Sequence, residues 1–427
     1  MRLICPIASL TLLMLSASLG REPEPHGIDR DAPRTVDVPT SPVDATPFLR
    51  SALASGRPLH LPVGDYRVTD TLTLAPGQRI EGDGVSSTRL LIGPDFNAAA
   101  PAIVTVAPGD ASGIDGIGFS FDQRGAQDRA TIRRYPWALD IRSATRFRIG
   151  RLRISGAWNG INAAGNAGGL DAGTVEIGAF NVGLAMDGLL DFAHVTTLHC
   201  WPFEIAQAPK LMAVYADGGS TCADIGRVDG LDVKSLDTFA SSVVFNARGG
   251  DGAARQIGQI QLDGDGALLR VEAGDVQIGA LSSTKGAVRA VPVIEWRGRV
   301  GLIGSLRLWG GNLGPSLVVA DGTLNVSGGS VENVADTTAI DVRGGTLMLA
   351  NTLLAPLPNQ IRTTPFVRQS GGALHAVGNR APGPSTGGGI LVAITADRPD
   401  TYVAFNAFNG WGFAKPAGKL RGTYAPN

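Results

Sequence analysis

The stretch from Gly113 to Gln261 decides the fold, because one short phrase recurs along it and beyond it. The phrase is an aliphatic residue, a turn pair that usually contains glycine, a second aliphatic residue and then alternation. Copies stand at Ile114–Phe119, Ile149–Ile154, Ile177–Val182, Val195–Cys200, Ile225–Val228, Ile257–Leu262, Ile278–Leu281 and Ile303–Leu308. The later copies follow one another after 21 and 25 residues, and such a period in a strand-like chain is typical of a solenoid.

Each copy describes a strand that ends on an aliphatic residue, a bend and the start of a new strand. Glycine supplies the positive φ that such a bend often needs. One unit cannot bury its own apolar side, so neighbouring units must stack. The sequence therefore predicts an all-β, single-stranded parallel β-helix whose successive turns lie about 4.8 Å apart.

The composition fits one elongated domain with an ample core. Of 427 residues, 44% are hydrophobic, 18% are charged and 58 are glycine. The net charge of −1 gives no overall field that would favour nucleic acid. Arginine far outnumbers lysine, which suits bidentate capture of sugar carboxylates, although genomic codon usage would explain the same bias.

The N-terminus has the pattern of a secretory signal peptide over residues 1–20. A short basic start precedes an apolar run from Leu3 to Leu15, and Ser18 and Gly20 form a small-x-small cleavage site. The apolar run is too short for a membrane span. We therefore expect a periplasmic or secreted protein with no integral membrane span.

Two cysteines remain after that segment, Cys200 and Cys222, and their separation is about one coil. An oxidising compartment permits a disulfide between them. The expected register turns Cys200 inward and leaves the direction of Cys222 undecided, so a bridge and two separate thiols both stay open.

The segment 21–45 is rich in proline and aspartate and is predicted to be a linker or a strap lying on the coil. A short helix follows, with Thr46 as its N-cap, Pro47 at the first helical position and Gly56 just past its end. Its apolar residues would cover the open end of the first coil, because exposed strand edges invite aggregation.

Two segments are predicted to leave the coil as long loops, Phe121–Trp137, which contains four arginines, and Ala206–Thr221. Long loops on a scaffold of this kind often shape the binding cleft. The β-helix itself is expected over residues 46–380, and residues 381–427 are expected to form a C-terminal cap.

The segment after the helix resembles the opening of a known superfamily. Pro58–Val68, Thr71–Leu74 and Gln78–Gly84 are similar to the "lP.G.Y.v...l.l" and "i.G.G" segments of many secreted pectate-lyase-like proteins, some of them described as family-28-related glycosidases. The resemblance covers the mature chain as architecture and implies a right-handed parallel β-helix that acts on polysaccharides. It does not imply one activity, since the superfamily includes lyases, hydrolases, epimerases and inactive binders.

Aligning the copies places one residue of each coil on a common outward stripe, with neighbours about 4.8 Å apart. That stripe contains Gly118, Arg153, Asn181, His199, Asp229, Gln261, Ser282 and Arg307. A second stripe contains Ser155, Gly183, Trp201, Leu231, Asp263 and Trp309, and the bends contribute Arg151 and Arg227. The alignment predicts that His199 and Asp229 lie within one hydrogen bond of each other.

A histidine–carboxylate pair beside arginines and a tryptophan suits an acidic glycan, because arginine pairs with uronates and aromatic faces stack on sugar rings. The predicted catalytic residues are His199, Asp229 and Arg153. The predicted substrate-binding residues are Trp201, Arg151, Arg227, Asn181 and Asp263. The alternative is a structural role, in which His199 and Trp201 pack under a loop and the arginines form an ordinary solvated strand face.

A further group of Asp187, Asp191 and His194 also fits the paired carboxylates of a glycosidase, although Asp187-Gly188 is equally ordinary turn chemistry. No reliable metal-ligand spacing is present, so no cofactor or metal is predicted. The resemblance allows a Ca²⁺ site built from scattered aspartates, and no motif locates one here.

The motif sets of characterised relatives are missing. The chain has no Asn-Thr-Asp, Asp-Asp, Gly-His-Gly or Arg-Ile-Lys set of a polygalacturonase, and no arginine-rich signature of a classical pectate lyase. The first hypothesis is an enzyme on an acidic polysaccharide, a lyase sooner than a hydrolase, because β-elimination needs a base and charge-stabilising cations. A glycoside hydrolase and a non-catalytic glycan-binding or surface-assembly protein remain alternatives.

Overall fold

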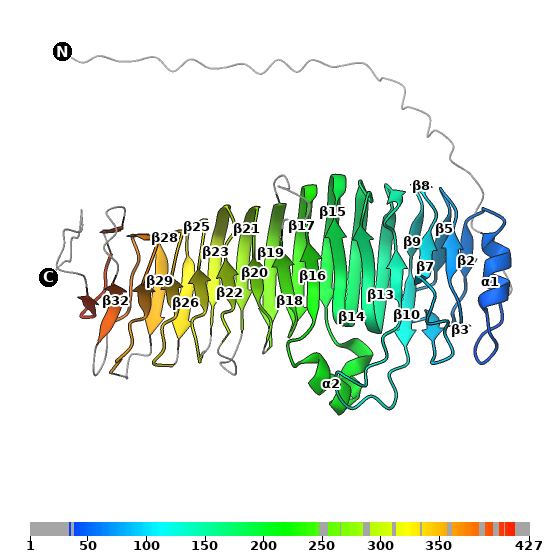
Figure 1. Cartoon of the computed structure of the whole chain (residues 1–427), viewed down its shortest axis with the longest axis horizontal. Coiled ribbons are helices and arrows are strands. Elements are labelled where there is room, and N and C mark those ends of the chain that lie inside the picture. Colours follow the sequence, from blue (N-terminus) through cyan, green and yellow to red (C-terminus); the bar gives the residue numbers. More distant parts are fainter. Residues whose placement is uncertain are drawn as a thin grey trace, which may run out of the picture. The chain divides into compact units, whose positions relative to one another are not determined.

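The structure, a computed structural model, describes residues 34–35, 38–246, 255–264, 266–284, 291–309, 313–333, 335–356, 361–383, 389–395, 401–404 and 406–414. The predicted signal peptide lies outside the described residues. The described chain is all-β and winds into a parallel β-solenoid of about 13 turns (Figure 1). The predicted fold class is confirmed.

The strands stack in three columns, which we call faces A, B and C, and each ladder between described strands is parallel. Seven long strands contribute to face A and turn the corner into face B without a break: β13 (Arg148–Ala164), β14 (Leu170–Asp187), β15 (Leu189–Cys200), β17 (Val228–Phe239), β19 (Arg255–Asp263), β21 (Asp275–Ser283) and β23 (Val300–Leu308). The strands β13 and β14 continue into face C as well.

Shorter strands complete the three faces. Face A adds β1 (Arg34–Thr35), β2 (Leu59–Leu61), β5 (Arg79–Gly82), β9 (Gly113–Asp115), β25 (Thr323–Val326), β28 (Thr346–Ala350), β31 (Ala373–Val377) and β33 (Tyr402–Ala404). Face B adds β3 (Gly64–Val68), β6 (Thr88–Ile92), β10 (Ile117–Phe121), β26 (Gly329–Asn333) and β29 (Thr352–Pro356).

Face C is built mainly from strands of three to five residues. They are β4 (Leu72–Leu74), β7 (Ala102–Val106), β11 (Trp137–Asp140), β16 (Thr221–Ile225), β18 (Ser242–Phe245), β20 (Leu269–Val271), β22 (Ile294–Trp296), β24 (Leu317–Val319), β27 (Ile340–Val342), β30 (Val367–Gln369), β32 (Ile390–Ile394) and β34 (Gly412–Ala414). A separate pair, β8 (Gly109–Asp110) and β12 (Ala144–Thr145), lies at the corner between faces C and A.

Aliphatic side chains stacked from coil to coil form the core. Side chains alternate between inside and outside along each strand, so one inward position recurs in every coil at the same height. At the start of face B this position is never more than 1% exposed in Leu152, Val175, Leu198, Leu236, Ile260, Leu281 and Leu306. One continuous column of apolar residues therefore replaces the layered core of a globular domain.

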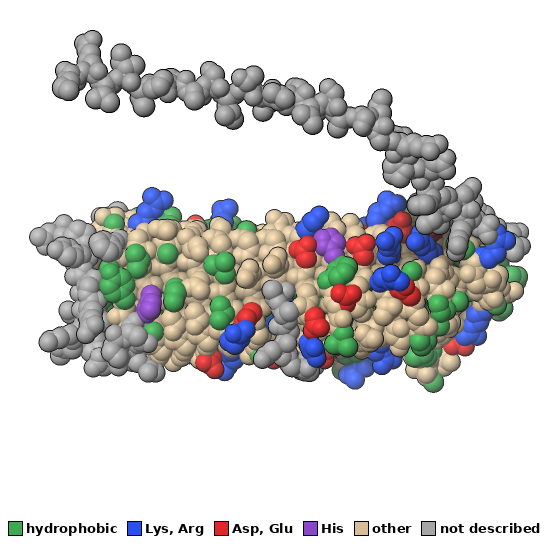
Figure 2. Space-filling view, turned by 90° about the horizontal axis from the view of Figure 1, so that it is seen from above, with side chains coloured by type: hydrophobic (Ala, Val, Ile, Leu, Met, Phe, Trp, Pro, Cys, Tyr) green, Lys and Arg blue, Asp and Glu red, His purple; other side chains and the backbone are tan. Residues whose placement is uncertain are grey.

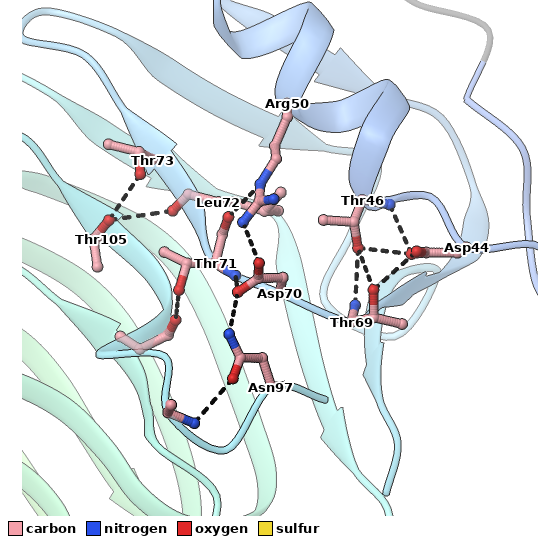
Figure 3. A network of polar contacts seen from close by, with 12 residues as sticks. Asp44, Thr46, Arg50, Thr69, Asp70, Thr71, Leu72, Thr73, Asn97 and Thr105 are labelled. Carbon is pink, nitrogen blue, oxygen red and sulfur yellow. Dashed lines mark hydrogen bonds and ion pairs between the residues drawn. The ribbon is translucent and has the colours of Figure 1, made fainter. Parts of the chain in front are cut away.

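The predicted capping helix is present as α1 (Thr46–Leu53), and Leu49 and Leu53 are buried beneath it. The predicted N-cap is wrong, because Thr46 is already helical and Ala45, without a side-chain cap hydrogen bond, stands at the N-cap position. The Asp44 carboxylate accepts hydrogen bonds from the Thr46 amide at 3.0 Å and from the Thr69 hydroxyl at 2.8 Å (Figure 3). The Thr46 hydroxyl instead accepts the Thr69 amide of the neighbouring coil.

The residues just before α1 lie along the first coil. The Ser41 amide donates to the Asp65 carbonyl at 2.6 Å, and the Ala45 amide donates to the Arg67 carbonyl at 2.9 Å. The side chain of Val38 is only 7% exposed. This part of the segment 21–45 is thus a strap on the solenoid.

The solenoid continues past residue 380, where the sequence analysis expected it to end. The strand β30 pairs with β32, β31 pairs with β33, and β32 pairs with β34, all in parallel. The described part of residues 381–427 therefore extends the coils instead of forming a separate cap.

Candidate functional site

The register of face B brings a set of polar side chains from different coils into one outward row. Arg153 of β13 pairs with Glu176 of β14, Glu176 with His199 of β15, and His199 with Asp237 of β17. Neighbours in such a row lie about 4.8 Å apart. The part of this row from β3 to β23, here called the face B row, contains Asp65, Arg89, Gly118, Arg153, Glu176, His199, Asp237, Gln261, Ser282 and Arg307.

Arg153 is held firmly within this row. Its Nε donates to Glu176 Oε2 at 2.8 Å, and its Nη1 donates to the Ser86 hydroxyl at 2.9 Å. Its guanidinium also lies over the ring of Phe203, 4.9 Å from the centroid. The Arg153 and Glu176 side chains are 23% and 21% exposed, so the cation is oriented but still reachable from solvent.

The same kind of pairing continues toward α1. Arg89 donates two hydrogen bonds of 2.7 Å to the two carboxylate oxygens of Asp65. The hydrogen bond with Asp65 raises the pKa of Arg89 above its ordinary value, and the charge of Glu204 adds to this. The face B row thus carries two oriented guanidinium groups with Gly118 between them, and the carbonyl oxygen of Val85 covers Gly118.

Aromatic rings surround His199. Its ring centroid lies 5.8 Å from that of Trp201 and 5.5 Å from that of Phe203, the latter in an edge-on arrangement. Trp201 in turn lies 4.8 Å from Phe239 of the next coil. All four rings are half-buried. His199 therefore has apolar rings around it, and its partners in the register, Glu176 and Asp237, provide a carboxylate in the coil on each side.

The predicted pairing of His199 with Asp229 is wrong. Asp229 lies near the start of β17, where it accepts a hydrogen bond of 3.1 Å from Nε of Arg227. The residue that stands beside His199 is Asp237, eight positions further along the same strand. The pairing was misplaced because Ile225-Gly226 resembles the bend between faces A and B but lies instead where face C ends.

Three further predicted residues lie away from the face B row. Asn181 bonds to Asn159 at 2.8 Å on the corner between faces B and C. The Arg151 amide donates to Asp115 and the Arg227 amide donates to Asp187, each at a bend between coils. The position in the row that the alignment gave to Asn181 belongs to Glu176.

The second predicted stripe is correct in part. Trp201 follows Cys200 and stands opposite Phe239 in the next coil. Phe239 pairs with Asp263 in the coil after that. Trp309 ends the same line, four coils from Trp201. Four coil spacings correspond to about 19 Å. Trp309 is 52% exposed, so this line, which runs parallel to the face B row, has aromatic residues at both ends.

The group of Asp187, Asp191 and His194 is divided by the structure. The Asp187 carboxylate accepts the Arg227 amide at 2.8 Å, which is turn chemistry. His194 lies on face A, where its Nδ1 is 3.1 Å from Asp232 Oδ2. The three side chains therefore do not form one paired-carboxylate site.

An insertion between β15 and β16 forms a wall beside face B. It contains a 3-10 helix, η1 (Phe203–Gln207), and α2 (Pro209–Tyr215), where the sequence analysis expected only a loop. It projects from the solenoid below β13 and β14 and lies next to the loop that follows β10 (Figure 1). Buried apolar side chains from both segments pack together there with Phe180 of β14: Ala126, Ile132, Ile205, Val214 and Tyr215.

Two further contacts fix this insertion. Arg129 of the loop after β10 donates to Asp217 at 2.9 and 2.5 Å and to the Phe180 carbonyl at 2.5 Å. Cys200 and Cys222, which flank the insertion, form a disulfide with their Cα atoms 5.6 Å apart. The bridge therefore closes the base of the segment that carries Trp201 and Phe203.

A hollow of about 460 Å³ lies between this insertion and the coils near α1. Its lining includes Ser120 and Ser155 from face B, Glu204 and Ile205 from η1, and Asp122 from the loop after β10. A hydrogen bond from Arg124 lowers the pKa of Asp122, which keeps this carboxylate charged. Ser155 lies two residues after Arg153 on the same strand, so the hollow adjoins the face B row.

Sequence reasoning missed Glu176, Asp237, Phe203 and Phe239. The signal that finds the first two is the spacing aliphatic-x-x-aliphatic-x-aliphatic, read without requiring glycine at the bend. This spacing aligns Ala172 with Val195 and Val233. Glycine follows Ala172 at the bend, whereas threonine follows Val195 and lysine follows Val233. The aromatic residues come from a corner and an insertion, which no repeat predicts.

Charged side chains are unevenly distributed along the solenoid. In the face shown in Figure 2 they gather toward the end that carries α1, whereas the opposite half is largely uncharged. Among the described residues no cluster of three or more histidine, cysteine or acidic side chains could hold a metal ion. Within that same part of the chain, no helix has the length and apolar character that a membrane crossing requires.

The fold and the row define a parallel β-solenoid with a polar and aromatic face. Comparisons of the chain with models of known families, with curated proteins and with solved structures found no match.

Proposed function

We propose that this protein is a secreted or periplasmic carbohydrate-active protein whose face B binds an acidic polysaccharide and cleaves it by β-elimination. The observation that carries the proposal is the register of face B, which sets Arg153, Glu176, His199 and Asp237 in one row beside Trp201. A polymer lying along the row would meet a cation, a titratable base and aromatic faces within a few coils.

Two residues of the row, Arg153 and His199, would take part directly in this chemistry. Arg153, already oriented by Glu176 and Phe203, would pair with the uronate carboxylate and stabilise the negative charge that develops on it. His199 would take the proton on the carbon next to that carboxylate. The bond to the leaving oxygen then breaks, a carbon–carbon double bond forms, and water protonates the leaving oxygen.

The polymer would follow the long axis of the solenoid. The line from Trp201 through Phe239 and Asp263 to Trp309 offers aromatic platforms separated by a hydrogen-bonding side chain. Sugar rings stack on such platforms and their hydroxyls bond to carboxylates. The hollow beside Ser155 would receive the end of the polymer nearer α1.

Absorbance from unsaturated products tests the reaction directly, with a panel of acidic polysaccharides as substrates. We expect the wild type to produce that absorbance and His199→Gln to lose it by about 100-fold or more. His375→Gln, the same change on face A in β31, should leave the rate unchanged. New reducing ends without the absorbance would instead indicate hydrolysis, for which Glu176 and Asp237 lie about 10 Å apart in the register.

A second function, glycan binding without cleavage, is favoured by one specific observation. His199 packs against Trp201 and Phe203, and Arg153 is already paired with Glu176. These contacts hold both side chains in place, which suits a rigid recognition surface. In that case acidic glycans would bind to the wild type, binding would survive His199→Gln, and no polysaccharide would be cleaved. Loss of binding in Arg153→Gln would still assign face B as the recognition surface.

A further inference from the structure

Face A carries an exposed aromatic residue that no neighbouring side chain covers. Phe192 is 56% exposed, and Leu190 beside it is 55% exposed. In the coils on either side, the positions opposite Phe192 are Gly169, whose amide donates to the Phe192 carbonyl at 2.9 Å, and Gly230. On one side the Arg146 side chain lies against Gly169, whereas on the other side Phe192 is itself the residue nearest to Gly230, so the ring of Phe192 can be approached along the solenoid axis from the Gly230 side.

Polar groups stand next to this ring, one position further along the outward side of the same strand. His194 follows Phe192 by two residues, which corresponds to about 7 Å. It pairs in the register with Asp171 on one coil and with Asp232 on the next. Its Nδ1 lies 3.1 Å from Asp232 Oδ2, and its Nε2 lies 3.4 Å from the Thr196 hydroxyl.

The charges of this second row nearly balance. Arg148 pairs in the register with Asp171, and the row continues toward α1 through Gly113 to Arg79. Within the described part of the chain, the Asp171 carboxylate has no hydrogen bond or ion pair, and the Asp232 side chain is 57% exposed. Hydrogen-bond acceptors therefore remain for a ligand, whereas the two carboxylates oppose an anionic one.

We propose that Phe192, His194, Asp171 and Asp232 form a second saccharide-binding site, on face A, for an uncharged hexose of a glycan. The ring of the sugar stacks on Phe192, and its hydroxyls donate to Asp171 and Asp232. His194, oriented by Asp232, bonds to a neighbouring hydroxyl. The site shares coils β14, β15 and β17 with the face B row but lies around the corner from it, so it does not depend on the function proposed there.

Calorimetric titration of the full chain with a panel of short neutral gluco-, manno- and galacto-oligosaccharides tests the site. We expect at least one of them to bind to the wild type and Phe192→Ala to lower the affinity about tenfold. Phe192→Trp should keep the affinity, because it keeps an aromatic face. Phe48→Ala is the matched control, since Phe48 is 49% exposed on α1 and should have no effect.

The two saccharide sites can fail separately. Phe192→Ala should leave the binding of acidic oligosaccharides unchanged, and Arg153→Gln should leave the binding of neutral ones unchanged. The proposal is overturned if no neutral oligosaccharide binds to the wild type, if Phe192→Trp binds as weakly as Phe192→Ala, or if Phe48→Ala weakens binding equally. It is also overturned if the wild type self-associates through this patch and Phe192→Ala abolishes that association, because the ring would then be a contact between protein molecules.

Discussion

Stacking constrains individual residues most strongly at the glycines on the corner between faces C and A. Gly322, Gly345 and Gly372 occupy equivalent positions in successive coils, each with φ of 62° or 63°. A Cβ atom on Gly345 would lie 2.3 Å from the carbonyl oxygen of Gly322, and one on Gly372 would lie 2.2 Å from that of Gly345. Both the backbone conformation and the neighbouring coil therefore exclude a side chain here.

Gly345→Ala should destabilise the protein by about 2–4 kcal/mol, since the left-handed conformation and the overlap with backbone both contribute. Gly77→Ala is the control, because Gly77 has φ of 74° but no atom within 4 Å of an added Cβ. It should cost only the conformational part, about 1 kcal/mol. Urea unfolding of the two variants gives the difference, and equal losses would show that coil contact is unimportant at Gly345.

Prediction of single residues from the sequence succeeded where glycine marks the bend between faces A and B. Gly150, Gly258, Gly279 and Gly304 mark it, which is why Arg153, Gln261, Ser282 and Arg307 were placed in the correct row. It failed for Asn181 and Asp229, because Ile177-Gly178 and Ile225-Gly226 repeat the phrase at other positions of the coil. The phrase reflects a bend, and more than one bend of a coil accepts glycine.

Among the elements, α1 depends on a single carboxylate. Burial on its own raises the pKa of Asp44, but the hydrogen bonds from Thr46 and Thr69 outweigh it, so the folded-state pKa is below the ordinary value. A carboxylate with a lowered folded-state pKa stabilises the fold fully above its unfolded-state pKa, about 3.9. That stabilisation is lost as the pH falls through the folded-state pKa.

Asp44→Asn should therefore lower the stability of the capped end by about 1 kcal/mol at neutral pH and much less in strong acid. The exposed Asp191 provides the control, because Asp191→Asn removes the same charge at a distance from the start of α1. Urea unfolding at neutral and at acidic pH measures both variants. If the loss for Asp44→Asn were the same at the two pH values, the charge of Asp44 would not be what stabilises α1.

The insertion is the element that the sequence predicted least well. Its helices η1 and α2 are short and carry few local signals, and their stability comes from packing against the loop after β10 and from Arg129. The repeat pattern identified where the chain leaves the coil. It contains no information on how two excursions separated by more than 80 residues pack together.

Arg129→Met should loosen the insertion without unfolding the solenoid, because it removes the hydrogen bonds to Asp217 and Phe180. We expect hydrogen exchange over residues 203–217 to rise about tenfold, as the loss of about 1.4 kcal/mol of local stability implies. Arg124→Met in the same loop is the control, since that side chain is 91% exposed and, among the described residues, forms its ion pair with Asp122 of its own loop. Unchanged exchange in Arg129→Met would mean that the apolar cluster alone holds the insertion.

At the scale of the whole molecule, the solenoid could be predicted because the residues of its core recur in the sequence at a regular spacing. A buried aliphatic residue returns in every coil, and polar residues between these positions must then point outward. The end of the solenoid could not be predicted in the same way. The coils after residue 380 replace the Ile-Gly phrase with other residues, and only their backbone pairing shows that the stack continues.

Because each coil contacts only its neighbours, damage to one coil should stay local. In Gly345→Ala we expect faster hydrogen exchange in β28, which starts directly after the substitution, and in its neighbours β25 and β31. The strands β13 and β14, several coils away, should exchange as in the wild type. A uniform rise along the whole solenoid would show that the molecule unfolds as one cooperative unit.

The central claim is that side chains far apart in the sequence form one working surface on face B. A crystal structure of the protein with an acidic oligosaccharide bound tests it most directly. The account predicts sugar density along face B, with a carboxylate at Arg153, a ring carbon facing His199 and a sugar ring against Trp201. An acidic oligosaccharide bound on face A or face C, with the face B row empty, would contradict it.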